Sequence, residues 1–158
     1  MGTRGLFGFY YKGKYYVVYN HYDSYPSGLG VLIVKELKRA IDEGRLEEWK
    51  SLLIQIKEVN PSIPPTEEEI NRLKCYSDLR VSNRKYTDWY CLLRNCQGSL
   101  EDVLKSGYIQ NHIHNGIPDW EEFAYIVNFD TNKLDFHIGS KLDTSYTFDN
   151  LPDWEEDF

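Results

Sequence analysis

Apolar and polar positions at the start of the chain follow a strand pattern. Residues 6–11 and 15–22 are rich in aromatic and β-branched side chains, which favour extended backbone. Lys12, Gly13 and Lys14 separate the two runs, and Gly13 supplies the positive φ that a tight turn requires. The pattern therefore predicts a β-hairpin within residues 3–22.

After residue 30 the period of the apolar positions changes from two to 3.6. Val34, Leu37 and Ile41 recur at helical spacing, and Gly44 follows where a helix-terminating glycine belongs. A second amphipathic stretch predicts a helix from about Arg45 to Glu58, because the prolines that follow cannot continue it. Two consecutive helices are therefore expected after the opening hairpin.

Shorter helices are predicted in the middle of the chain from their capping signals. Thr66 followed three residues later by Glu69 has the spacing of a capping box. Thr87 is expected to cap the next helix and Ser99 the one after it, which ends at Gly107.

The last third of the chain returns to strand patterning. Residues 123–129 form a near-continuous apolar run, residues 133–138 alternate, and residues 130–132 lie between them as a turn. Residues 146–148 are expected to add a third short strand. With a hairpin near each end, the predicted fold class is α+β: one antiparallel sheet formed by the N-terminal and C-terminal hairpins, with the middle helices packed on it.

The length of 158 residues matches one domain, and no linker or repeat divides the chain. We therefore expect residues 1–158 to form a single globular domain, with residues 153–158 as a mobile acidic tail. A hydrophobic share of 41% and a charged share of 27% exclude a disordered or low-complexity chain. No apolar stretch approaches the roughly 18 residues of a membrane-spanning helix, so a membrane protein is not expected.

The charge is unevenly distributed along the chain. The net charge is −7, which argues against a general binder of nucleic-acid phosphates. Residues 119–158 contain eleven acids and two lysines. This acidic end is either ordinary solvated surface, or it docks within the chain or onto a second copy with Trp154 and Phe158 as apolar anchors.

Cysteine and histidine positions give little sign of redox or metal chemistry. The three cysteines have no Cys-x-x-Cys spacing, so free buried thiols and a reducing compartment are expected for Cys75, Cys91 and Cys96. The first residues lack the apolar core of a secretory signal, so secretion is not expected. No cysteine or carboxylate stands at supporting spacing, so neither a metal site nor a cofactor is predicted at His112, His114 or His137.

Aromatic residues are concentrated in the opening hairpin, where seven of the thirteen tyrosines fall within the first 25 residues. Strand alternation puts Phe7 and Phe9 on one face and Leu6 and Tyr10 on the other. We therefore expect the second face to be buried as well, or to form an interface between copies. Base stacking is the alternative use of such rings, but the acidic charge and the absence of an RNP-type pattern speak against nucleic acid.

The densest run of functional side chains is residues 20–25, which precede the glycines at the start of the first helix. The candidate residues for binding a ligand or partner are Asn20, His21, Tyr22, Asp23, Tyr25, Gly28 and Gly30. The glycines would let a ligand approach the first amides of the helix. His21 and Asp23 beside Ser24 are the candidate catalytic residues of a nucleophilic hydrolase. In the alternative interpretation these side chains only close the turn.

Two long segments carry a resemblance to a known family. The opening MGTRG with YNHYDSYPSGLG at residues 19–30, and the closing segments at residues 125–130 and 148–152, resemble an uncharacterised family of large nucleocytoplasmic DNA viruses of the Marseillevirus type, with fungal and more distant bacterial relatives. The similar segments cover about a third of the chain. The resemblance implies a viral protein, packaged in the virion or acting in the host cytoplasm or nucleus, and it implies no catalytic assignment.

Together these observations predict a small interaction or binding protein rather than an enzyme. Its expected partner is another protein, or a second copy bound through the aromatic hairpin. The alternative is a small hydrolase that uses His21, Asp23 and a nearby Ser or Thr.

Overall fold

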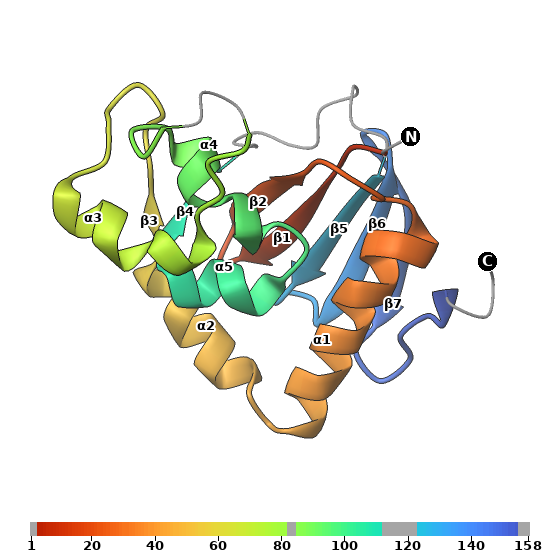
Figure 1. Cartoon of the computed structure of the whole chain (residues 1–158). Helices are drawn as coiled ribbons and strands as arrows, with labels where there is room; N and C mark the ends of the chain where they lie inside the picture. Colours follow the sequence, from red (N-terminus) through yellow and green to blue (C-terminus); the bar gives the residue numbers. More distant parts are fainter. Residues whose placement is uncertain (1–2, 82–84, 112–122, 155–158) are drawn as a thin grey trace.

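The computed structural model describes residues 3–81, 85–111 and 123–154 and has a mixed α+β architecture (Figure 1). The strands of the five-stranded sheet, in spatial order, are β2 (Lys14–Asn20), β1 (Gly5–Tyr11), β5 (Phe123–Asn128), β6 (Lys133–Ile138) and β7 (Lys141–Thr147). The segments between β2 and β5 are the helical turn η1 (Pro26–Gly30), α1 (Val31–Asp42), α2 (Leu46–Gln55), β3 (Lys57–Glu58), α3 (Glu67–Arg72), η2 (Lys74–Tyr76), α4 (Trp89–Leu92), η3 (Arg94–Cys96), α5 (Leu100–Ser106) and β4 (Tyr108–Ile109).

The two ends of the chain share one sheet, as the sequence predicted. Pairing is antiparallel within each hairpin, and β7 extends the closing hairpin over more residues than the expected 146–148. The strands β1 and β5 run parallel, with Gly5 opposite Phe123, so the sheet is mixed rather than wholly antiparallel. A parallel pair needs a long crossover, which here is the helical middle of the chain.

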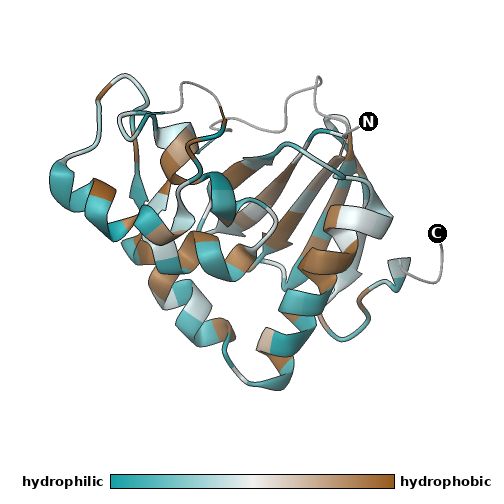
Figure 2. Ribbon diagram, in the orientation of Figure 1, coloured by the Kyte–Doolittle hydropathy of each residue, from teal (hydrophilic) through white to brown (hydrophobic). Residues whose placement is uncertain are grey.

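One face of the sheet carries the main core. Phe9 stacks on Phe129 at 5.8 Å and meets Trp49 of α2 edge-on at 6.0 Å. Buried Ile33 and Leu37 extend the same core from α1. Figure 2 shows hydrophobic positions along the strands and in stripes on α1 and α2, with hydrophilic positions between them. The helices therefore bury their apolar stripes against this face of the sheet.

The opposite face of the sheet is also buried, which confirms one of the two expectations for it. Leu6, Val17, Ala124 and Ile126 form a second apolar cluster, and each is at most 1% exposed. Half-buried tyrosines, including Tyr10, pack around this cluster. The aromatic hairpin therefore contributes to two apolar clusters.

The predicted helices differ from the structure mainly at their ends. The first helix is confirmed, and Gly44 follows it with φ of +67°. The second helix stops at Gln55 instead of Glu58, because Lys57 and Glu58 form β3 beside β4. There the backbone N–H of Lys57 donates to the carbonyl of Gly107 over 2.9 Å. A tertiary strand pair thus replaces the last helical turn that the pattern suggested.

Two of the three predicted caps are confirmed. Thr66 and Glu69 make both hydrogen bonds of a capping box at the start of α3. Ser99 caps α5, which ends at Gly107 in a left-handed conformation. The prediction for Thr87 is wrong: the Asp88 side chain caps α4 by accepting from the N–H of Tyr90 over 2.9 Å. Asp88 stands one residue closer to the helix and offers a stronger acceptor.

The expected mobile tail, residues 153–158, includes a docked aromatic side chain. Trp154 is 5% exposed and contacts the rings of Phe136, Tyr125 and Tyr146, with centroids 5.1–5.7 Å away. The first part of the expected mobile tail is thus held within the chain. Phe158 lies outside the described residues.

The three cysteines are free, as predicted, but they are not all buried. Cys91 and Cys96 are buried, and burial raises the pKa of the Cys96 thiol to about 12. Cys75 is exposed, because it lies in the short η2 turn rather than in a buried helical face. None of the helices in the described part of the chain has the length and apolar character needed to cross a bilayer.

Candidate functional site

A groove of about 460 Å³ lies between the loop that follows β2 and the segment that follows α4. One wall consists of Asn20, Tyr22, Asp23, Ser27 and Gly28. The start of α1 contributes apolar side chains, and the other wall consists of Arg94, Gln97 and Gly98. The groove therefore contains the polar loop that the sequence singled out and a second segment about 70 residues further along the chain.

The loop is shaped by a tight backbone contact. Asp23 has φ of +53°, a conformation that Asp adopts more readily than most residues. The N–H of Leu29 donates to the Asp23 carbonyl over 2.8 Å. A Cβ at Gly28 would lie 2.3 Å from that oxygen, so only glycine fits there. Gly28 therefore serves the closure of the loop.

The loop is also anchored to the sheet. The hydroxyl of Tyr125 donates to the carbonyl of Ser24 over 2.7 Å, and the N–H of Ser24 donates to the carbonyl of Thr3 over 3.1 Å. Burial raises the pKa of Tyr125, which keeps this donor protonated. Both contacts come from segments at the centre of the sheet, so the groove wall is rigidly placed.

Asn20 and Ser24 bind each other inside the loop. The Asn20 side-chain amide donates to the carbonyl of Tyr22 over 2.6 Å and to the Ser24 hydroxyl over 2.9 Å. Ser24 is fully buried. Its hydroxyl is therefore a structural partner of Asn20 and is closed off from solvent.

His21 is directed toward its own strand and toward the opposite wall. Its Nδ1 lies 2.8 Å from the hydroxyl of Tyr19, and its ring meets that of Tyr22 edge-on at 4.4 Å. Its backbone N–H donates to the side-chain oxygen of Gln97 over 3.0 Å. This last hydrogen bond ties the two walls of the groove together.

Asp23 accepts a hydrogen bond from the hydroxyl of Tyr25 over 3.0 Å, and this bond raises the pKa of Tyr25. Within the described residues, no hydrogen bond joins any two of the three candidate catalytic residues His21, Asp23 and Ser24. The structure thus brings them into one loop without the contacts of a nucleophile, base and orienting acid.

Arg94 supplies the cation of the opposite wall. Its guanidinium carbon lies 5.7 Å from the centroid of the Tyr22 ring, which is within cation–π range. Its Nε is buried and has no hydrogen-bond partner in the described ranges of the chain. A buried donor without a partner costs about 1–3 kcal/mol. The groove is therefore lined by a cationic side chain whose Nε has no partner within the described part of the protein.

Gly30 has a packing role and lies away from the groove. A Cβ at this position would meet Cε3 of Trp154 at 2.7 Å and Cε1 of Tyr125 at 3.1 Å. The glycine therefore makes room for the docked tryptophan ring, whereas the sequence suggested that it would admit a ligand.

Sequence reasoning missed the second wall of the groove. Arg94, Gln97 and Gly98 line the groove, and no local pattern marks them as neighbours of residues 20–28. The only signal was compositional, since residues 72–94 contain six Lys or Arg and two Asp. Their placement depends on how η3 packs beside the sheet, which is a tertiary property.

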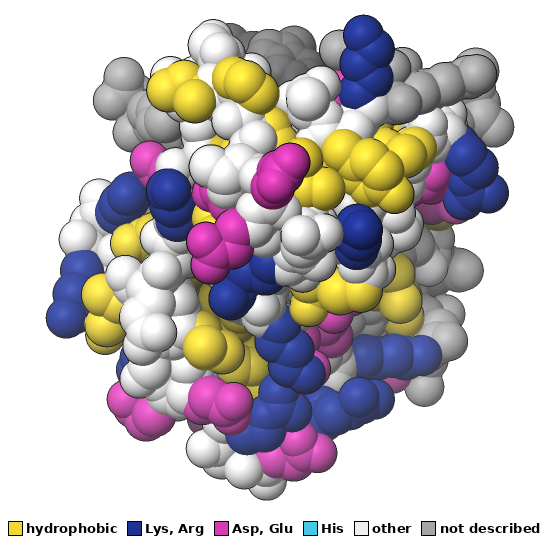
Figure 3. Space-filling model, turned by 60° about the vertical axis from the view of Figure 1, so that its left-hand side comes forward, with side chains coloured by type: hydrophobic (Ala, Val, Ile, Leu, Met, Phe, Trp, Pro, Cys, Tyr) yellow, Lys and Arg dark blue, Asp and Glu magenta, His cyan; other side chains and the backbone are white. Residues whose placement is uncertain are grey.

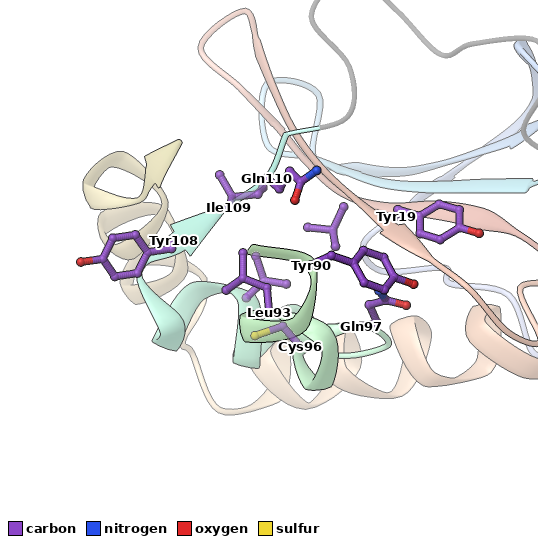
Figure 4. A pocket seen from close by; sticks show the side chains of 10 residues that line it. Tyr19, Tyr90, Leu93, Cys96, Gln97, Tyr108, Ile109 and Gln110 are labelled. Atoms are coloured by element: carbon purple, nitrogen blue, oxygen red, sulfur yellow. The ribbon is translucent and has the colours of Figure 1, made fainter. Parts of the chain in front are cut away.

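A small apolar pocket adjoins the groove (Figure 4). It has a volume of about 30 Å³, roughly that of one water molecule or methyl group. Its wall includes Tyr19, Tyr90, Leu93 and Gln97, and Gln97 lines the groove as well. The pocket admits a small apolar group at most.

Of the three histidines considered for a metal site, the structure describes one, His137. Among the described residues, no three His, Cys, Asp or Glu side chains are grouped as a metal site would need. His112 and His114 lie outside the described residues. His137 is half-buried on β6, its Nδ1 has no hydrogen-bond partner among the residues that the structure describes, and burial lowers its pKa.

No family model, curated protein or solved structure matches the chain. The function is therefore inferred from the groove itself.

Proposed function

We propose that the chain is a binding protein whose groove takes a carboxylate-bearing segment of a protein partner. The observation that carries the proposal is Arg94, which lines the open groove and whose Nε has no hydrogen-bond partner among the described residues. A carboxylate satisfies a guanidinium through two parallel hydrogen bonds, which is the strongest pairing that this side chain makes. A carboxylate bound in the groove would thus give the Arg94 guanidinium a charged partner.

The exposed apolar side chains of the groove support a peptide rather than a free acid. Tyr22 is 57% exposed and Leu32 is 52% exposed, and they line the same groove as Arg94. Such side chains offer apolar area to residues that flank a partner's Asp or Glu. Asp23 on the facing wall adds an acceptor for a backbone N–H, which would set the orientation of the peptide.

The same loop argues against Ser24 as the nucleophile of a hydrolase. Ser24 is fully buried, and its hydroxyl is engaged with Asn20. A nucleophile needs an accessible hydroxyl beside a base. From the resemblance of the opening and closing segments to a family of large DNA viruses, we further propose a role in the cytoplasm or nucleus of an infected cell.

Peptide selection on the full-length chain tests this proposal. Displayed random peptides are selected against the protein, and the affinities of the enriched peptides are measured for the wild type, Arg94→Gln and Arg80→Gln. Arg80 is the matched control, because it is an exposed arginine whose guanidinium is already paired with Asp78. We expect peptides with an essential Asp or Glu whose affinity falls about tenfold or more in Arg94→Gln only. Enriched peptides that bind Arg94→Gln as tightly as the wild type would overturn the proposal.

Turnover measurements separate the hydrolase. We expect no Ser24-dependent cleavage of p-nitrophenyl acetate by the wild type. Cleavage that disappears in a folded Ser24→Ala or His21→Ala variant would favour hydrolysis over binding.

A further inference from the structure

A second groove, of about 280 Å³, lies on the helical side of the molecule, at the ends of α2, α3 and α5 and beside β3 and β4. Figure 3 shows this side, with Lys and Arg side chains gathered in a band and apolar side chains beside them. Three cations line the groove: Lys57 of β3, Arg72 of α3 and Lys105 of α5. Among the described side chains that line this groove, none is acidic. Three elements thus direct positive charge toward one opening.

The arginine in this groove is held in place. The Nε of Arg72 donates to the carbonyl of Ser106 over 3.3 Å, and its guanidinium carbon lies 5.9 Å from the centroid of the Tyr108 ring. A Cβ at Gly107 would approach a terminal nitrogen of Arg72 to 3.1 Å, so glycine leaves room for the guanidinium. The Nε of the Arg72 guanidinium is hydrogen-bonded, and the Tyr108 ring lies against the face of the group. The other N–H groups of Arg72 are therefore preorganised for a ligand.

The carboxylates around the groove leave both lysines available. The Nζ of Lys57 lies 3.5 Å from Glu69, and the Nζ of Lys105 lies 3.8 Å from Glu101. The lysine side chains are 67% and 58% exposed. Ion pairs of this kind contribute little, since water screens them and the long side chains lose entropy. A multivalent anion in the groove would therefore compete well for both ammonium groups.

We infer that this groove binds the phosphate group of a small phosphate monoester. Such a group carries up to two negative charges and three free oxygens, which suits a fixed guanidinium with two mobile ammonium groups. The Tyr108 ring does not offer a stacking platform, because Arg72 lies over it and Trp89 lies 5.9 Å from it. The site therefore recognises the phosphate and not an attached base. It is separate from the Arg94 groove and does not depend on the proposed function.

Calorimetric titration of the full chain tests the inference, with glycerol 3-phosphate, adenosine monophosphate and inorganic phosphate at constant ionic strength. We expect all three to bind, and the two monoesters to have affinities within about threefold of each other. Arg72→Gln and Lys105→Gln should each weaken binding about tenfold or more. Lys12→Gln, which removes an exposed lysine at the β1–β2 turn, should leave the affinity unchanged.

Three results would overturn the inference. The first is that none of the three phosphate compounds binds at concentrations up to about 10 mM. The second is unchanged binding in Lys105→Gln, an exposed substitution that leaves the fold intact even if Arg72→Gln does not fold. The third is adenosine monophosphate binding much more tightly than glycerol 3-phosphate, since the base would then be the recognised group. Loss of peptide binding in Arg94→Gln is measured separately, so the two proposals fail independently.

Discussion

The carboxylate of Glu36, on α1, accepts a hydrogen bond from the backbone N–H of Leu100 over 2.7 Å. Its other oxygen accepts from the hydroxyl of Ser99 over 2.7 Å. The first amide groups of a helix have no partner within the helix and carry partial positive charge. A side chain from a distant helix thus satisfies the start of α5 and fixes α5 against α1.

We expect Glu36→Ala to lower the free energy of unfolding by about 1–3 kcal/mol, because it leaves these donors unpaired in a partly buried place. Glu36→Gln should cost less, since its amide oxygen still accepts one hydrogen bond. Urea unfolding followed by circular dichroism measures both. Glu47→Gln, an exposed substitution on α2, is the control and should change stability by about 0.5 kcal/mol or less.

The titration of Glu36 gives the same contact a pH signature. Burial raises the pKa of Glu36 in the folded protein, so the folded state holds this proton more tightly than the unfolded state. The contribution of Glu36 to stability therefore increases as pH falls through its folded pKa. The unfolding free energy of the wild type, taken relative to that of Glu36→Gln, should therefore increase as pH falls from about 7 to about 4. A difference that is flat with pH would contradict this assignment.

The capping box of α3 should show the opposite pH dependence. The N–H of Thr66 donates to Glu69 and lowers the pKa of that carboxyl, so this stabilisation is present above the unfolded pKa and is lost as pH falls through the folded pKa. Thr66→Ala should cost about 1 kcal/mol in urea unfolding at pH 7. Glu68→Gln is the matched control in the same helical turn. Equal effects of the two substitutions would show that the box contributes nothing.

The local signals in the sequence were sufficient for most elements. Aromatic, β-branched and apolar runs with turn residues between them predicted both hairpins, and Thr66 and Ser99 identified two helix starts. The end of α2 was missed because the hydrogen bonds of Lys57 go to a strand that lies 50 residues away, and periodicity carries no information on such a partner. The parallel β1–β5 pair was missed for the same reason, since strand patterning does not encode direction.

Trp154 is expected to be a major contributor to stability. Trp154→Ala should lower the free energy of unfolding by about 3–5 kcal/mol, because it leaves a cavity among three aromatic rings. Gly30→Ala should have a related effect, since the added methyl group occupies the space of the indole ring. Leu142→Ala on β7 is the control, because Leu142 is half-exposed. If Trp154→Ala unfolds at the same urea concentration as the control, the docked ring is not part of the core.

Asp130 joins the two hairpins at their turns. Its carboxylate accepts from the N–H of Lys12 over 2.8 Å and from the N–H of Gly13 over 3.1 Å. Asp130→Ala should therefore cost about 1 kcal/mol, and Asp130→Asn should recover part of it. Hydrogen exchange of these two amides provides the direct measurement. Faster exchange in Asp130→Ala but not in Asp143→Ala is the expected result, and unchanged exchange would exclude the contact.

The candidate site was predictable only in part. The run of polar side chains at residues 20–25 lies in the loop between β2 and α1, and part of it lines the groove. The chemistry expected of it changed, because Ser24 is buried and His21 bonds to Tyr19. Arg94 and Gln97 enter the groove only through the packing of η3, which depends on contacts between remote segments.

The parallel pairing of β1 with β5 also sets the order in which the protein can mature on the ribosome. The strand β1 can pair with β2 once residue 20 has emerged, but its other edge has no partner strand until residues 123–128 have been made. During that interval the nascent hairpin displays an unpaired backbone edge and aromatic side chains from both faces, which favours aggregation. Tyr125, whose hydroxyl holds the loop at the Ser24 carbonyl, belongs to β5. The groove therefore assembles only when most of the polypeptide has been translated.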